Sequence, residues 1–136
     1  SLRLGRCIKG CGGGHVVNTA SMAGLTTVPQ LADYVVSKHA VVALTESLRA
    51  DLDATSSGVG ATVLCPGPVQ TPMADQLASG RRPPSPPIDP TAVAGAALAA
   101  IEANALYAIP AGDPLPRINA RIERVLAAAA LGDLDT

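Results

Sequence analysis

The chain has 136 residues, a length that suits a single domain, and 48% of them are apolar. It holds no Trp, no Phe and two Tyr, so its core has to be built from Ala, Val, Leu and Ile, which pack well between helices and a sheet. Ten basic and 11 acidic residues give a net charge of −1, a balance that excludes a basic surface for nucleic acid or for an anionic membrane.

Residues 1–14 show no clear periodicity and are expected to be an irregular leader, without the apolar stretch of a signal peptide. No apolar run in the chain approaches the roughly 18 residues of a membrane span, so we expect no membrane association and a cytoplasmic location. Cys7, Cys11 and His15 lie four apart, which invites a metal site. The glycines between them oppose a helix that would bring these side chains to one face, so no metal is expected.

From residue 15 onward, short β-branched runs alternate with helical patterns. The expected strands are 15–19, 61–64 and 106–109, and the expected helices are 31–55, 90–103 and 117–131. The stretch 23–30, between the first strand and the first helix, is expected to be loop. This alternation predicts βαβ crossovers, a parallel sheet and an α/β fold. Three strands make a thin sheet, which suggests that part of the fold lies upstream.

Breaker residues mark the ends of these elements. Residues 56–58 end the long helix, and Gly132 is the stop signal of the last one. Residues 79–90 hold five prolines and are expected to form an extended loop rather than a domain linker. At the end of this loop, Asp89 is placed to cap a helix that has Pro90 in its first turn.

The helix expected over 31–55 is apolar on more than one face. Its apolar residues are Val35, Val36, Ala40, Val41, Val42, Leu44, Leu48 and Leu52. A helix with so broad an apolar surface needs burial on both sides. The sheet can cover one side, and the other needs a second helix or a partner subunit.

Three polar side chains are expected at one edge of the sheet. Tyr34 and Lys38 are four apart in the first turns of the long helix, so they project from the same face. Ser21 follows the first strand, and a Pro-Gly-Pro turn begins at Pro66 after the second strand. Ligands of parallel α/β sheets bind outside the carboxyl ends of the strands, so the sequence predicts a site there.

The segment from His15 to Met73 resembles the catalytic half of the short-chain dehydrogenase/reductases. The matching pieces are Val17-Asn18-Thr19-Ala20-Ser21, Tyr34-x-x-x-Lys38 and Pro66-Gly67-x-Val69-x-Thr71, in this order and with fitting separations. The helix text between the second and third pieces, residues 43–49, also looks like that family. The later segments of the chain fit more loosely.

The resemblance implies a role for each matching residue. Tyr34 would be the general acid/base for the substrate oxygen, and Ser21 would hold and polarise that oxygen by a hydrogen bond. Lys38 would bind the nicotinamide ribose hydroxyls, and its positive charge would favour the phenolate form of Tyr34. The residues expected to line the nicotinamide pocket are Pro66, Gly67, Val69 and Thr71.

The resemblance also implies a partial Rossmann-like, doubly wound parallel sheet whose N-terminal half is missing. Within one domain, the leader 1–14 would precede a catalytic core over 15–73. A substrate-loop region over 74–90 and a C-terminal α/β segment over 91–136 would follow.

The implied cofactor is NAD or NADP. The family's glycine-rich phosphate-binding turn belongs upstream, since Gly5, Gly10 and the glycines at 12–14 neither follow a strand nor open a helix. The residue that selects between the two cofactors is absent as well. So is the asparagine of the family's proton relay, because Asn18 lies in the strand beside Ser21. We therefore expect the isolated chain to bind cofactor weakly or not at all.

Three functions stay open at this point. The first is an oxidoreductase acting on a small-molecule alcohol or carbonyl substrate. The second is an inactive, truncated remnant that keeps the motifs. The third is a small interaction module that uses the helix 31–55, and the resemblance implies a homo-oligomer through that same helix. The substrate cannot be read, because the loop 72–89 has no diagnostic chemistry and Arg81 and Arg82 in it are expected to be solvated.

Overall fold

The computed structural model describes residues 13–72 and 86–131. In chain order the elements are β1 (Gly14–Thr19), η1 (Met22–Gly24), α2 (Ala32–Ala54), β2 (Val59–Leu64), α4 (Pro90–Glu102), β3 (Tyr107–Ala108) and α5 (Leu115–Ala130). All three strands are parallel and lie in the order β1-β2-β3, so the predicted α/β fold with a parallel sheet is confirmed. The leader predicted over 1–14 and the stop signal at Gly132 lie outside the described residues, apart from Gly13 and Gly14.

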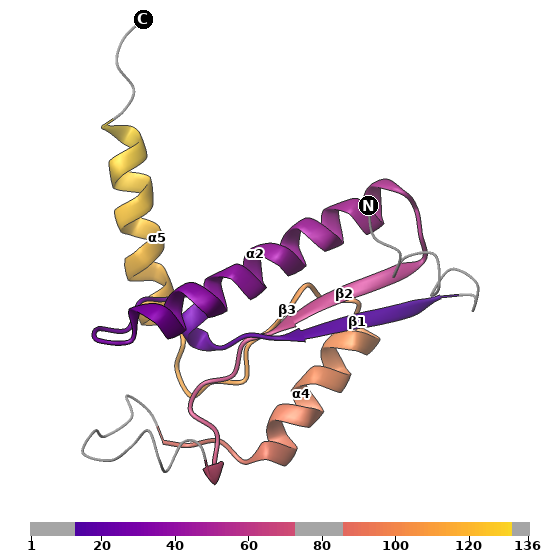
Figure 1. Cartoon of the computed structure of the whole chain (residues 1–136), viewed down its shortest axis with the longest axis horizontal. Coiled ribbons are helices and arrows are strands. Elements are labelled where there is room, and N and C mark those ends of the chain that lie inside the picture. The colour runs from indigo at the N-terminus through magenta and orange to yellow at the C-terminus, as the bar shows by residue number, and fades with distance from the viewer. Residues whose placement is uncertain (1–12, 73–85, 132–136) are drawn as a thin grey trace, which may run out of the picture.

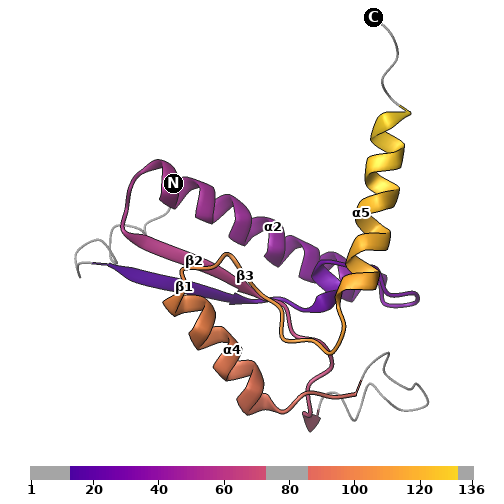
Figure 2. The same cartoon turned by 180° about the vertical axis from the view of Figure 1, so that it is seen from behind.

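The two helices α2 and α4 cover opposite faces of the sheet (Figures 1 and 2). Side chains alternate across β1, so Val16 packs towards α2 and Val17 packs towards α4. The central strand β2 is buried along its whole length. The chain therefore forms the three layers expected of a parallel sheet, with its core on both sides of β2.

Three local predictions are corrected by the structure. Residues Met22–Gly24, within and just before the predicted loop, form a short 3-10 helix because the side chain of Ser21 caps it. β2 begins at Val59, two residues earlier than predicted, since Gly58 turns the chain with a φ of +68°. β3 is shorter than predicted and ends at Ala108. Pro110 has no amide hydrogen to donate, so it cannot extend the ladder of hydrogen bonds to β2.

The predicted start of α4 is confirmed. The Asp89 side chain accepts a hydrogen bond from the Thr91 amide at 2.6 Å, and Pro90 occupies the first turn. This backbone hydrogen bond lowers the pKa of Asp89, as expected for a carboxylate that caps a helix.

Helix α5 stands apart from the three layers and points away from them (Figures 1 and 2). None of its residues is buried, although Ile122, Val125 and Leu126 are large and apolar. Arg117 in its first turn donates a hydrogen bond to the Thr27 carbonyl at 3.2 Å and so ties the base of α5 to the loop before α2. Among the described helices, none is long and apolar enough to cross a membrane.

A phenol–carboxylate hydrogen bond joins β3 to α2, with Tyr107 donating to Glu46. Burial, followed by the hydrogen bond to Glu46 and the charge of Glu46, raises the pKa of Tyr107 to about 12 from the ordinary 10.0. The folded state thus holds this proton more tightly, and the resulting stabilisation is complete below pH 10 and is lost as the pH rises through 12.

We expect Tyr107→Phe to be less stable than the parent at neutral pH, with the difference shrinking above pH 10. Urea unfolding of both proteins, from neutral pH to above pH 10, measures the difference in their free energies of unfolding. A difference that stays constant through the range would contradict the assigned pKa.

Candidate active site

The segment that carries Ser21 lies against the turn that follows β2. The amide of Ala20 donates to the Leu64 carbonyl at 2.8 Å, and the amide of Met22 donates to the Pro66 carbonyl at 2.9 Å. These two bonds continue the β1–β2 ladder past the carboxyl ends of both strands. The structure thus brings Ser21 and Pro66 together at the edge where the sequence predicts a site.

Ser21 is half-buried and acts as the N-cap of η1. Its hydroxyl oxygen accepts a hydrogen bond from the Ala23 amide at 3.2 Å, which leaves the hydroxyl hydrogen unused in that contact. A serine hydroxyl fixed in this way can donate to a substrate oxygen. The local reason for the cap is the preference of serine for the position before a helical turn.

Tyr34 and Lys38 lie on the first turns of α2, as their spacing predicts. The Lys38 Nζ lies 5.6 Å from the centroid of the Tyr34 ring. The same Nζ approaches the Thr19 carbonyl at 3.5 Å, at the carboxyl end of β1. Lys38 therefore lies between the Tyr34 ring on α2 and the strand that leads into Ser21. Tyr34 keeps 37% of its surface exposed.

Gly24 sets how closely η1 approaches α2, a role that the sequence reasoning missed. A Cβ at this position would lie 2.7 Å from the Lys38 carbonyl oxygen and 2.8 Å from Cγ2 of Val42. Both distances are too short for real carbon contacts, so only glycine permits this packing. In the sequence, Gly24 falls in the stretch 23–30 that was expected to be loop, so no close packing was predicted for it.

The four predicted pocket residues after β2 form a turn that is tied to the neighbouring segments. Gly67 donates to the Pro110 carbonyl at 3.0 Å, and Val69 forms a parallel bridge with Ile88. Thr71 is half-buried at the end of this turn. A small hollow of about 50 Å³ lies here, lined by Met22, Gly67, Pro68, Ala111, Gly112, Asp113, Pro114 and Arg117.

Cys65 lies beneath this edge and is fully buried. Burial raises the pKa of its thiol to about 11, although a hydrogen bond from the Ser21 backbone opposes the shift. The thiol therefore stays protonated at neutral pH and is a structural neighbour of Ser21 rather than a nucleophile.

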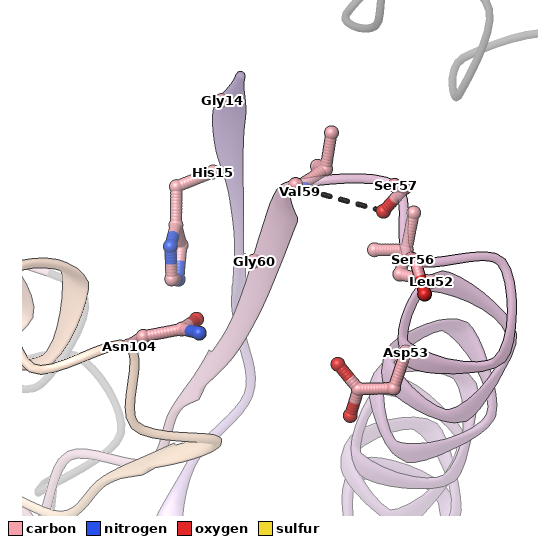
Figure 3. Close-up of a pocket in the computed structure, with 10 residues that line it drawn as sticks. Gly14, His15, Leu52, Asp53, Ser56, Ser57, Val59, Gly60 and Asn104 are labelled. Atoms are coloured by element: carbon pink, nitrogen blue, oxygen red, sulfur yellow. Dashed lines mark hydrogen bonds between the residues drawn. The ribbon is translucent and has the colours of Figure 1, made fainter.

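A larger cavity of about 380 Å³ lies at the opposite, amino-terminal edge of the sheet (Figure 3). His15 and Asn104 lie on one side of β2 there, and Asp53 lies on the other. The His15 Nε2 is 2.7 Å from the Thr62 hydroxyl, and burial, followed by the charge of Arg49, lowers the pKa of His15.

None of the predicted catalytic or cofactor-binding residues lines this larger cavity. Of the predicted site residues, only Gly67 lines the smaller hollow. Parallel sheets bind ligands at the carboxyl ends of their strands, so the edge that carries Ser21 and Gly67 stays the predicted place of the chemistry. Cys7 and Cys11, which the sequence grouped with His15, lie outside the described residues.

Comparison with known proteins identifies the family of the chain. The sequence model of the short chain dehydrogenase family matches residues 4–82, which is more than half of the chain. The chain belongs to the short-chain dehydrogenase family. All of the predicted site residues, from Ser21 to Thr71, fall inside the part that matches this family.

Three known dehydrogenases illustrate the similarity. The 1-deoxy-11-beta-hydroxypentalenate dehydrogenase of Streptomyces avermitilis is 49% identical over 67 residues, which cover 49% of this chain and 24% of that enzyme. A short chain dehydrogenase/reductase from Burkholderia phymatum, in complex with NAD, is 30% identical with a TM-score of 0.63, over 90% of this chain and 50% of that one. A short chain dehydrogenase from Burkholderia cenocepacia, in complex with NADP, is 26% identical with a TM-score of 0.62, over 94% and 46%.

The chain thus spans about half the length of these solved short-chain dehydrogenases, and its match covers a quarter of the curated relative. The agreement in fold supports a partial Rossmann-like sheet as the architecture of the chain.

Proposed function

We propose that this chain supplies the proton-transfer part of an oxidoreductase that moves a hydride between a nicotinamide cofactor and a small alcohol or carbonyl substrate. The observation that carries the proposal is the position of Lys38, whose Nζ lies 5.6 Å from the Tyr34 ring and 3.5 Å from the Thr19 carbonyl next to the Ser21 turn. Membership of the short-chain dehydrogenase family supports the same chemistry.

In this proposal Tyr34 exchanges a proton with the substrate oxygen. In the oxidative direction the phenolate of Tyr34 accepts the proton of the substrate hydroxyl. The carbon that bears this hydroxyl gives up a hydride to the nicotinamide cofactor, so that a carbonyl forms. In the reductive direction the phenol returns the proton to the oxygen. Ser21 donates a hydrogen bond to that oxygen and so holds it beside Tyr34.

Lys38 and the turn after β2 would bind the nicotinamide end of the cofactor. The Lys38 ammonium offers donors to ribose hydroxyls at the carboxyl edge, and Gly67 lies in the turn beside a small hollow there. The proposed pocket residues are Pro66, Gly67, Val69 and Thr71. NAD or NADP, when bound, accepts or supplies the hydride, and the chain's own residues supply position and the proton.

A chimera tests this function directly. Residues 13–72 replace the matching segment of the Streptomyces avermitilis dehydrogenase, to which this chain is 49% identical over 67 residues. We expect the chimera to turn over the relative's own substrate with a change in nicotinamide absorbance. A folded chimera that binds cofactor but has no turnover would support an inactive remnant instead.

The isolated 136-residue chain is expected to bind cofactor poorly. In the described residues β1 leads into η1 through Ser21, and β2 leads into a proline turn, so neither strand is followed by a glycine-rich turn and a long helix. Such a turn receives the pyrophosphate in dinucleotide-binding folds. Calorimetric titration with NADH and NADPH should give millimolar or weaker affinity, and submillimolar binding would refute this expectation.

The outer face of α2 supports pairing of two copies. Val36 is 69% exposed and Leu44 is 60% exposed on the side of the helix that faces away from the sheet. We propose that this face of the segment 31–55 is a homo-oligomer interface. A cytoplasmic location stays a prediction.

Sedimentation measures the pairing. Leu44→Asp is expected to weaken association at least tenfold, because a carboxylate would be buried without a partner. Val125→Asp, which adds the same charge to an exposed position of α5, is the matched control. Equal effects of both substitutions, or a parent that is monomeric at high concentration, would contradict the assigned interface.

A further inference from the structure

A partly buried hydrogen bond between side chains joins β1 to α2 close to the proposed site. Asn18 Nδ2 donates to the Thr45 hydroxyl at 3.0 Å, and that hydroxyl donates to the Val41 carbonyl at 2.7 Å. Thr45 is fully buried. Because the single hydroxyl hydrogen is used on Val41, the oxygen is left to accept from Asn18, which fixes the direction of both bonds.

The pair lies between two apolar clusters on the same face of the sheet. On one side Val16 packs with Leu48 and Leu52, and on the other side Ala20 packs with Val42. Apolar contacts are non-directional, so they hold α2 on the sheet without defining its position along β1. A hydrogen bond with a defined donor and acceptor does define it.

The same stripe of α2 carries Lys38. Lys38, Thr45 and Leu52 are seven residues apart, a spacing that places them on one side of a helix. These three residues contact β1 one after another along the strand. Leu52 packs in the cluster that contains Val16, Thr45 accepts a hydrogen bond from Asn18, and Lys38 approaches the Thr19 carbonyl. A shift of α2 by one turn would move Lys38 by about 5.4 Å relative to β1.

We propose that Asn18 and Thr45 are positioning residues, which set the register of α2 on β1 so that Tyr34 and Lys38 stand beside Ser21. The assignment rests on the function proposed above, but the register itself is a property of the fold. Buried polar pairs between packed elements have this role in other folds, where they specify one alignment among several of similar apolar packing.

Three variants separate positioning from simple stabilisation. Thr45→Val removes the hydroxyl at nearly constant volume, and Thr45→Ser keeps it. Thr62→Val is the matched control, because Thr62 is also fully buried and its hydroxyl bonds to the Ala105 carbonyl at 2.6 Å, away from α2.

In the chimera we expect Thr45→Val to lower kcat at least tenfold with a smaller change in KM, since displacement of a catalytic group by about 1 Å can cost about 100-fold. Thr45→Ser should stay within about threefold of the parent in kcat, and Thr62→Val should lower the melting temperature with little effect on kcat. Equal kcat in Thr45→Val and the parent, measured below both melting temperatures, would overturn the proposal.

The 136-residue chain provides a readout that does not need activity. Nuclear Overhauser contacts between the methyl groups of Ala20 and Val42, and between those of Val16 and Leu48, report the register. We expect these contacts to weaken in Thr45→Val and to be kept in Thr45→Ser and Thr62→Val. Unchanged contacts in Thr45→Val overturn the register claim, whereas an inactive parent chimera with the expected contact changes overturns only the oxidoreductase function.

Discussion

Replacing Tyr34 by Phe in the chimera is expected to lower kcat by roughly 10²–10⁴-fold, the contribution usual for a positioned general acid/base. The substitution removes only the phenolic oxygen from a side chain that is 37% exposed, so the fold should be unchanged. KM and the affinity for cofactor should stay close to those of the parent, because Lys38 still reaches the end of β1. Steady-state kinetics with the relative's substrate, together with cofactor titration, measure all three quantities.

A control on the same helix shows whether this loss is specific. Ser47→Ala removes a hydroxyl from an exposed position of α2, five residues beyond Val42, and should leave kcat unchanged. If Tyr34→Phe retains more than a tenth of the parent's kcat, the proton passes through another group, and the role assigned to Tyr34 is wrong.

Gly24→Ala is expected to damage both stability and activity. The new Cβ would lie 2.7 Å from the Lys38 carbonyl oxygen and 2.8 Å from Cγ2 of Val42, so η1 has to move away from α2. Overpacking of this kind costs about 1–3 kcal/mol. Because η1 begins at Ser21 and the contacted turn of α2 carries Lys38, the movement also separates the proposed catalytic groups. We expect kcat of the chimera to fall about 100-fold.

Gly95→Ala is the matched control for this substitution. Gly95 lies in the interior of α4, and a Cβ there would meet nothing within 4 Å. An alanine in a helix interior is favoured over glycine by about 0.5–1 kcal/mol, so this variant of the 136-residue chain should melt at a higher temperature than the parent. If the close approach is real, thermal unfolding shows a lower melting temperature than the parent for Gly24→Ala and a higher one for Gly95→Ala. A Gly24→Ala chain as stable as the parent would contradict it.

The sequence was sufficient for features that depend on near neighbours. The spacing of Tyr34 and Lys38 predicts their common face, because helical periodicity is a local property. The start of α4 was predictable from Asp89 and Pro90 for the same reason. Ligands of parallel sheets bind at the carboxyl ends of the strands. This rule predicts Ser21 at the carboxyl edge, which is where the structure has it.

Features that depend on tertiary contacts were not predictable. Asn18 was interpreted only as a strand residue, and nothing in the spacing indicates that it bonds to Thr45, 27 residues away. The requirement for glycine at position 24 arises from the Lys38 carbonyl on another element. Arg49 is a further example, because it contacts Asp53 on its own helix and also Asn104, 55 residues along the chain.

We propose that one hydroxyl, one phenol and one ammonium act together at the carboxyl edge of the sheet. A crystal structure of the chimera with NAD or NADP bound tests this proposal most directly. We expect the Lys38 Nζ within hydrogen-bond distance of the nicotinamide ribose. We also expect the Ser21 and Tyr34 hydroxyls to face one position next to the nicotinamide ring. A cofactor bound at the amino-terminal edge near His15, or the three groups directed to separate surfaces, would contradict the proposal.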